Sequence, residues 1–191
     1  MLTQMPEKPI GRPATYQDLL AVPDHLVAEI LDGELYTSPR PAPRHAVASG
    51  RLTVDLIPPY SDGRGGPGGW LIVGEPEIHL ASDVVVPDLA GWRRERMPRL
   101  PKEAYFPAAP DWACEVVSPS TRRMDRRKKL PIYAREHVSH LWLVDPDART
   151  VEVLRLESGH WVIDVVAGDE DKVRLQPFAD IEIDLRDLWA E

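Results

Sequence analysis

Apolar residues near the start of the chain follow a short helical pattern and then a strand pattern. Thr15-Tyr16-Gln17-Asp18 has the form of a capping box, which predicts a short helix that ends before Pro23. Two apolar runs then follow, at residues 26–31 and 34–36. They flank Asp32-Gly33, a pair suited to the positive φ angles of a tight turn. The pattern therefore predicts a helix followed by a β-hairpin.

A second helix is predicted over residues 44–57, where apolar residues recur at helical spacing. Pro58-Pro59 is expected to end it. Residues 61–69 contain five glycines, but no Gly-Lys-Ser/Thr follows and the next apolar run reads as a strand. A phosphate-binding loop needs a helix in that place, so we interpret these residues as a mobile connector.

From Trp70 onward the apolar residues form short extended runs separated by turn formers, which is typical of strands. The predicted strands are residues 70–74, 77–80, 84–92, 112–117, 140–145, 150–156 and 160–166. Residues 93–110 contain four prolines and are predicted to be a loop.

One more helix is predicted from about Asp125 to His137. Pro131 lies inside it, where a proline removes a hydrogen bond and costs about 3 kcal/mol, so the helix either starts just before Pro131 or kinks there. Residues 181–185 read as a closing strand or helix. We therefore expect an α/β (α+β) protein with a mixed sheet and few helices. Residues 1–14 are predicted to be a flexible leader, and residues 15–191 a single domain.

The composition fits one globular domain, with 191 residues of which 43% are hydrophobic. Cys114 is the single cysteine, which excludes disulfide-stapled scaffolds and four-cysteine zinc sites and favours a reducing compartment. We expect it to be a core thiol, and we expect the tryptophans to pack in the core or at its edges. No apolar run is long enough for a membrane span, and the first residues lack the pattern of a signal peptide. The expected location is the cytoplasm.

The net charge of −8 argues at first against a nucleic-acid partner. Residues 122–129, however, hold six basic residues and one acidic residue, a local charge of +5. The rest of the chain has 17 basic and 30 acidic residues, a charge of −13. One cationic segment therefore interrupts an acidic protein.

Two acidic residues interrupt strands that otherwise look buried. Asp88 lies in the run 84–92 and Glu115 in the run 112–117. Carboxylates are almost never fully buried unless they are paired or bound to something. If the two strands are neighbours, these carboxylates converge and offer the hard oxygen ligands that Mg²⁺ prefers. The alternative is that each carboxylate faces solvent on an alternating strand.

Glu29 and Lys129 are further candidates. Glu29 lies in the apolar run before the hairpin turn, where it could also face solvent. Lys129 shares one helix face with Asp125 and Tyr133, at spacings of four residues. A lysine beside a metal-bound water can orient or deprotonate that water and neutralise the charge of a transition state. The alternative is a solvated ion pair with Asp125.

These residues resemble the PD-(D/E)XK nuclease superfamily. Pro87-Asp88 and Glu115-Val116-Val117 match its signature, except that Val117 stands where the signature has lysine. With the spacing of Asp125 and Lys129 and the run 142–146, the chain is similar to the Uma-type family of restriction endonucleases. In that family the lysine comes from the helix, and Lys129 occupies the matching position. The resemblance covers residues 15 to about 165.

The resemblance implies a restriction-endonuclease-like core, a mixed sheet flanked by helices, and Mg²⁺- or Mn²⁺-dependent hydrolysis of DNA phosphodiester bonds. It implies that Asp88, Glu115 and the Val116 carbonyl ligate the metal. Lys129 would act on the attacking water, and Glu29 would assist the metal or its water shell. His45 matches a family histidine at a helix start, where it either positions phosphate or caps the helix.

The cationic segment is the candidate DNA-binding surface, and a solvated helix start is its alternative. The expected phosphate contacts are Arg122, Arg123, Arg126 and Arg127. Two other functions stay open at this point: a catalytically weak nucleic-acid-binding or accessory protein, and an oligomeric scaffold. A homodimer or higher homo-oligomer is a further expectation, because cutting both strands of a duplex often uses two symmetric sites.

Overall fold

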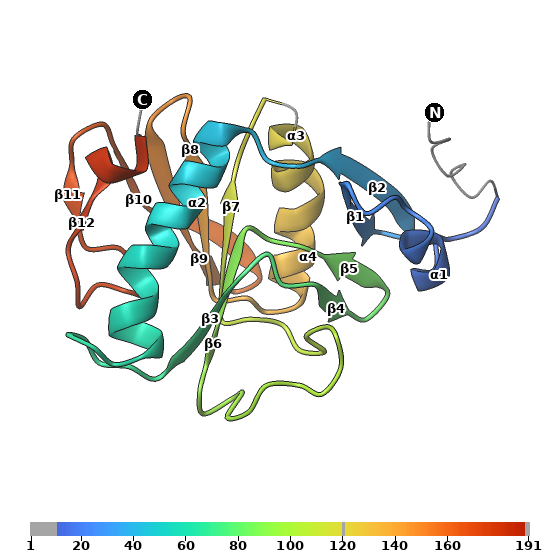
Figure 1. Cartoon of the computed structure of the whole chain (residues 1–191), viewed down its shortest axis with the longest axis horizontal. Helices are drawn as coiled ribbons and strands as arrows, with labels where there is room; N and C mark the ends of the chain where they lie inside the picture. Colours follow the sequence, from blue (N-terminus) through green and yellow to red (C-terminus); the bar gives the residue numbers. More distant parts are fainter. Residues whose placement is uncertain (1–10, 120, 190–191) are drawn as a thin grey trace.

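Six strands form the central sheet of the protein, in the order β10-β9-β8-β7-β6-β3 (Figure 1). The structure is a computed structural model that describes residues 11–119 and 121–189, so residues 1–10 of the predicted leader lie outside the described residues. Strands β7 and β8 pair in parallel and the other neighbours pair antiparallel, which confirms the predicted mixed sheet. The strands are β3 (Trp70–Gly74), β6 (Leu89–Arg93), β7 (Trp112–Val116), β8 (His140–Asp145), β9 (Thr150–Glu157) and β10 (His160–Gly168).

A smaller sheet has the strand order β2-β1-β5-β4. Its strands are β1 (Leu26–Leu31), β2 (Glu34–Pro39), β4 (Ile78–Leu80) and β5 (Asp83–Val85). The predicted hairpin is confirmed: Asp32 and Gly33 have φ angles of 52° and 76° at the turn between β1 and β2. Helix α1 (Tyr16–Leu20) begins at the predicted capping box, in which Thr15 and Asp18 bond each other's backbone N–H.

The link between the two sheets corrects one prediction. Residues 84–92 were expected to form one strand, but β5 ends at Val85 in the small sheet and β6 begins at Leu89 in the central sheet. Pro87 has no N–H to donate to a ladder, which suits it to the break between them. The chain therefore crosses from one sheet to the other at Val86-Pro87-Asp88, and Asp88 lies at the crossing.

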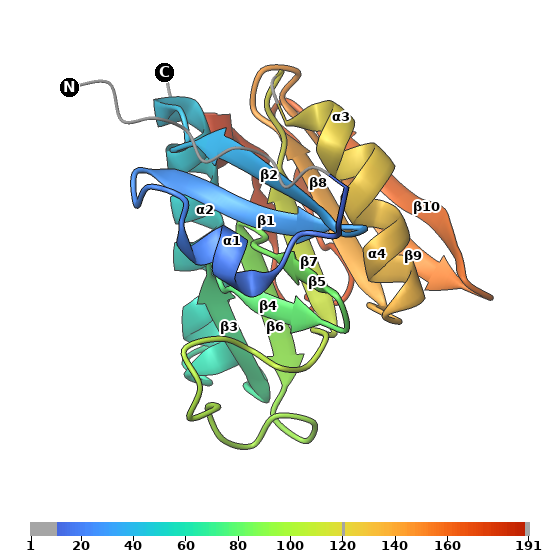
Figure 2. The ribbon, with the colours of Figure 1, turned by 90° about the vertical axis from the view of Figure 1, so that its right-hand side faces the viewer.

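Helices cover both faces of the central sheet (Figures 1 and 2). Helix α2 (Pro43–Leu56) packs on one face together with a closing segment, β11 (Lys172–Val173), β12 (Ile183–Asp184) and the 3₁₀-helix η3 (Leu185–Trp189). The opposite face packs against the small sheet and a second helical segment. That segment consists of α3 (Arg122–Met124), the π-helical turn η2 (Asp125–Lys129) and α4 (Leu130–Arg135). The part of the chain that the structure describes has no helix long and apolar enough to cross a membrane.

Prolines in the two long helical segments lie within or directly after wide turns. Helix α2 ends at Leu56, just before Pro58-Pro59 as predicted, but the chain continues into a π-helical turn, η1 (Ile57–Ser61), that contains both prolines. In η1 the N–H of Asp62 bonds the carbonyl of Ile57, five residues earlier. At Pro131 the first predicted alternative fits better: α4 begins one residue before it, directly after the π turn η2. Both wide turns accommodate prolines that the ordinary helix ladder excludes.

Aromatic side chains fill the core under α2. Trp70, Trp112 and Trp142 are buried around Phe178, with ring centroids 4.8–5.7 Å from it, so these tryptophans pack in the core as predicted. Gly91 lies between two of them, and a Cβ at this position would come within 3.2 Å of both the Trp70 and Trp112 rings. Cys114 is fully buried in the same cluster, as expected for a core thiol.

Candidate functional site

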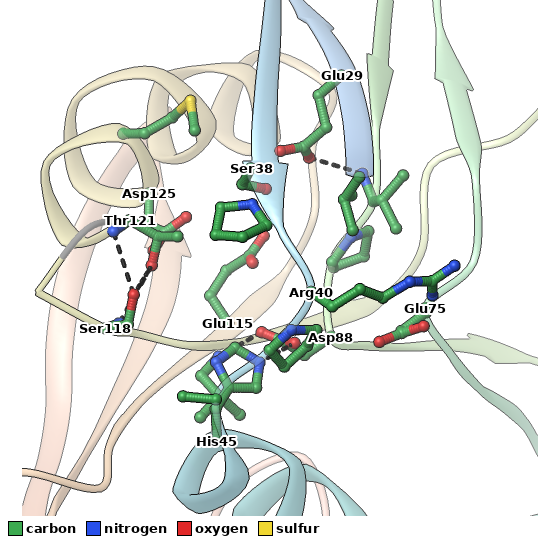
Figure 3. A pocket seen from close by; sticks show the side chains of 18 of the residues that line it. Glu29, Ser38, Arg40, His45, Glu75, Asp88, Glu115, Ser118, Thr121 and Asp125 are labelled. Carbon is green, nitrogen blue, oxygen red and sulfur yellow. Dashed lines mark hydrogen bonds and ion pairs between the residues drawn. The ribbon is translucent and has the colours of Figure 1, made fainter. Parts of the chain in front are cut away.

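A cavity of about 350 Å³ lies where the two sheets and the two helical segments meet (Figure 3). Strand β1 contributes Glu29, the crossing between the sheets contributes Asp88, β7 contributes Glu115 and η2 contributes Lys129. His45, from the first turn of α2, also lines it. The structure therefore brings together five of the polar residues that the sequence singled out.

Asp88 is held at both carboxylate oxygens. Antiparallel pairing of Leu89 with Cys114 sets β6 beside β7, and the N–H of Val116 donates to Oδ2 of Asp88 at 2.7 Å. Nε2 of His45 bonds the other oxygen, Oδ1. Helix α2 has no side-chain cap, so the capping alternative for His45 is wrong. His45 instead fixes the orientation of Asp88.

Glu115 is buried on the central sheet and does not face solvent. Every residue of β7 is buried, and 2% of Glu115 is exposed. The hydroxyl of Tyr133 donates to Oε1 at 2.6 Å, and Nζ of Lys129 donates to Oε2 at 3.1 Å. Burial raises the pKa of Glu115, and the Lys129 ammonium opposes this shift.

Lys129 is buried among carboxylates, with 4% of the residue exposed. Its Nζ lies 2.9 Å from Glu29, 3.1 Å from Glu115 and 3.9 Å from Asp125. Burial alone lowers the pKa of Lys129, but the carboxylates of Glu115, Glu29 and Asp125 outweigh it and hold the pKa above its ordinary value. Lys129 is therefore a buried ammonium, and the alternative of a solvated surface lysine is wrong.

The crossing between the sheets supplies backbone groups to the buried charge cluster of Lys129, Glu29, Glu115 and Asp125. The N–H of Val86 donates to Oε1 of Glu29 at 2.8 Å, and the Val86 carbonyl accepts from Nζ of Lys129 at 3.3 Å. A residue that leaves a sheet loses ladder partners for both backbone groups. Here Glu29 and Lys129 replace them, which fixes both side chains to the joint between the sheets.

Two residues of the cluster had no functional role in the sequence interpretation. Asp125 is 3% exposed, and burial raises its pKa to about 6, opposed by the charge of Lys129 and a hydrogen bond with Thr121. Tyr133 is fully buried, with its hydroxyl on Glu115. The four-residue spacing of Asp125, Lys129 and Tyr133 did predict that they share a face. Arg40 and Glu75 also line the cavity, and no sequence pattern indicated them.

The donor chemistry of the cavity fits a divalent cation. Glu29, Glu115 and Asp125 surround the buried ammonium of Lys129 and Asp88 also lines the cavity, so the acidic side chains that line it outnumber the lysine and arginine. Carboxylate and carbonyl oxygens are the ligands that Mg²⁺ and Mn²⁺ prefer. Among residues 11–119 and 121–189, no three His, Cys, Asp or Glu side chains already form a metal-binding group. An ion would therefore take Asp88 and Glu115 away from some of their present partners.

The arginines of the cationic segment do not line the cavity. Arg122 pairs with Asp145 and Arg126 pairs with Glu152, which ties the helix to β8 and β9. Arg123 and Arg127 are exposed, and neither forms an ion pair within the described ranges. Two of the four predicted phosphate contacts are thus already used within the protein.

Comparison of the chain with known protein families and solved structures agrees with this fold. The model of the Uma2 family, described as "putative restriction endonuclease", matches residues 13–186. A crystal structure of "a putative nuclease belonging to DUF820" from Anabaena variabilis is similar with a TM-score of 0.73 and 23% sequence identity, over 93% of this chain and 98% of that one. No curated protein sequence matches the chain.

Proposed function

Because this chain belongs to the Uma2 family, we propose that it is a metal-dependent endonuclease that hydrolyses phosphodiester bonds in DNA. Its fold and family are those of a restriction-endonuclease-like nuclease. The proposal adds two points to these: hydrolysis depends on a metal ion, and the nucleic acid that is cut is DNA.

The observation that supports catalysis most strongly is the position of Lys129. The helical turn η2 places the Lys129 ammonium within 3.1 Å of both Glu29, from the small sheet, and Glu115, from the central sheet. The usual superfamily signature has a lysine two residues after the glutamate on the strand, where this chain has Val117. A buried ammonium beside two acids restores the missing charge from another element.

Asp88 and Glu115, with the Val116 carbonyl, would hold Mg²⁺ or Mn²⁺. When bound, the ion supplies Lewis-acid polarisation of a phosphate oxygen and lowers the pKa of a coordinated water. His45 and the Val116 N–H keep the Asp88 carboxylate oriented. Such orientation by neighbouring hydrogen bonds strengthens metal sites.

Lys129 acts as a charged hydrogen-bond donor in this proposal. Since the surrounding carboxylates keep its pKa high, it orients the attacking water and stabilises negative charge on the phosphate, and it does not take up the proton. Glu29 lies 2.9 Å from the ammonium and is fixed by the Val86 N–H, so it positions Lys129 and can accept a hydrogen bond from the water shell.

The test is nicking of supercoiled plasmid by the purified protein with Mg²⁺ or Mn²⁺. We expect wild type to nick, and Asp88→Ala and Lys129→Met to lose at least about 100-fold in rate, as for loss of one transition-state stabilising group. Asp180→Asn, an exposed carboxylate that bonds Tyr60 outside the cavity, should nick like wild type. If Asp88→Ala nicks as fast as wild type, the catalytic proposal is wrong.

One observation favours a second candidate, a nucleic-acid-binding protein without catalysis. Both oxygens of Asp88 and both of Glu115 already have partners within the protein. If metal cannot displace any of them, the protein would bind DNA without cutting it. DNA binding together with the absence of nicking in either metal would support this function.

A further inference from the structure

Tyr133 is a buried tyrosine whose hydroxyl contacts a proposed metal ligand. None of its surface is exposed, and its hydroxyl donates to Oε1 of Glu115 at 2.6 Å. The ring packs in the core cluster between the central sheet and α4, together with Ile132 and Leu143. Packing therefore fixes the ring, and the ring fixes the hydroxyl on one oxygen of Glu115.

The other oxygen of Glu115, Oε2, accepts a hydrogen bond from Lys129, which also has other partners. Lys129 donates to Oε2 at 3.1 Å, but its Nζ also lies 2.9 Å from Glu29 and 3.9 Å from Asp125, and it bonds the Val86 carbonyl. If Lys129 releases Oε2, its charge remains compensated by two carboxylates. Loss of the Tyr133 bond, in contrast, would leave a buried hydroxyl without this acceptor, which is costly.

From this asymmetry we infer that Tyr133 is a positioning residue for metal binding: it anchors Oε1 of Glu115, so that Oε2, which Lys129 can give up, is the oxygen available to the cation. The inference rests on the proposed function, because it needs Glu115 to be a metal ligand. It adds a role for Tyr133 and distinguishes the two partners of Glu115. Hydrogen bonds to metal-binding carboxylates typically contribute a factor of about 10–100 in metal affinity or activity.

The test is the affinity of Tyr133→Phe for Mn²⁺, measured by titration calorimetry without DNA. This variant keeps the packed ring and removes only the hydroxyl. Tyr60→Phe is the matched control, because Tyr60 is also buried, packs in the other core, and its hydroxyl bonds the exposed Asp180. We expect Tyr133→Phe to raise the Kd for Mn²⁺ about 10–100-fold and Tyr60→Phe to leave it unchanged.

Plasmid nicking gives a second readout. In Tyr133→Phe the Mn²⁺ concentration for half-maximal rate should rise by the same factor as the Kd, while the rate at saturating Mn²⁺ stays within a few-fold of wild type. A merely structural role would lower stability in both Phe variants and leave the Mn²⁺ affinity of both unchanged.

Wild-type protein provides a test that needs no variant. The buried hydroxyl proton of Tyr133 should remain visible by NMR at saturating Mg²⁺, because its bond to Glu115 persists. Loss of that signal on Mg²⁺ binding would overturn the inference, and so would an unchanged Mn²⁺ affinity in Tyr133→Phe. If wild type binds no metal, or if Glu115→Gln binds it as tightly as wild type, the proposed function fails together with the inference.

Discussion

Lys129 shows how a charged side chain can be stable in the interior of this protein. Its ammonium contacts carboxylates from a strand of each sheet and from its own helix, namely Glu29, Glu115 and Asp125. Removing one partner of a buried ion pair is more costly than removing an exposed pair, because the remaining charge stays buried without compensation.

We therefore expect Lys129→Met to lower the free energy of unfolding by about 3–5 kcal/mol. Lys128→Met is the matched control on the same helix, because Lys128 forms an exposed ion pair with Asp32 and its loss should change stability little. Urea unfolding of the metal-free proteins measures both. Equal stability of the two variants would contradict a buried charge cluster.

Asp125 should make stability depend on pH. Its pKa is raised from 3.8 to about 6 by burial, against the opposing charge of Lys129, with Glu29 and Asp88 also nearby. Between these two values the unfolded chain loses the proton and the folded protein keeps it, so the contribution of Asp125 to stability falls as pH rises.

Replacing Asp125 by asparagine removes this dependence. Relative to wild type, Asp125→Asn should become more stable from pH 4 to pH 7, by up to about 3 kcal/mol at one pKa unit per 1.36 kcal/mol. Thermal unfolding across this range tests it, with the exposed Asp147→Asn as the control for loss of a carboxylate. A stability difference that stays constant with pH would show that Asp125 does not titrate in this window.

At the scale of the elements, the helical segment that carries Lys129 depends on a π turn. Leu130 bonds the carbonyl of Asp125, five residues earlier, and Pro131 follows directly. Because Pro131 has no N–H, it cannot restore the ordinary bond to the carbonyl four residues before it. The wide turn, which contains Lys129, therefore contributes to where its ammonium lies.

Pro131→Ala should allow this turn to become α-helical, which would shift Lys129 relative to Glu29 and Glu115. We expect plasmid nicking to fall by about 100-fold, as displaced catalytic groups often cause, without a loss of thermal stability. Pro58→Ala in η1 is the matched change outside the cavity and should nick like wild type. Nicking by Pro131→Ala at the wild-type rate would mean that the π turn does not position Lys129.

Local signals explain which elements were predictable from the sequence. The capping box at Thr15, the turn at Asp32-Gly33 and the alternating runs depend on neighbours in the chain, and all three appear in the structure. The division of residues 84–92 between two sheets depends on partners far away, β1 for one half and β7 for the other. The pattern of apolar residues within 84–92 is the same whether the segment forms one strand or two, so this pattern could not predict the division.

Local sequence patterns likewise indicated some residues of the candidate site and not others. Acids in apolar strands and the four-residue spacing on the helix indicated Glu29, Asp88, Glu115 and Lys129, and the structure brings them together. The burial of Asp125 and the contact between Tyr133 and Glu115 depend on how the helix packs on the sheet. The pairing of Arg122 and Arg126 with acids of β8 and β9 was equally invisible.

At the scale of the whole molecule, the charge of −8 means that the proposed DNA binding must depend on a few local cations. Arg123 and Arg127 are exposed and form no ion pair within the described residues, whereas Arg122 and Arg126 must first leave Asp145 and Glu152. If the helix contacts phosphates, the first pair should contribute more counterion release than the second.

We expect the double change of Arg123 and Arg127 to alanine to reduce the slope of log affinity against log salt by about 1.8, at about 0.9 per lost phosphate contact. The double change of Arg122 and Arg126 to alanine should reduce it less. Fluorescence anisotropy with short duplexes in EDTA measures binding without cleavage. An unchanged slope in the first variant would remove this helix from the DNA-binding surface.

The loop between β6 and β7 divides the candidate site along the chain. Residues 102–104 are exposed in this loop. A break there would leave Glu29, His45 and Asp88 on one fragment and Glu115, Lys129 and Tyr133 on the other. Neither fragment holds all the proposed metal ligands, so the proposed cleavage activity would depend on their reassociation. The loop is thus a suitable place to divide the proposed nuclease into two inactive halves. Binding partners fused to the halves would then bring them together and restore activity.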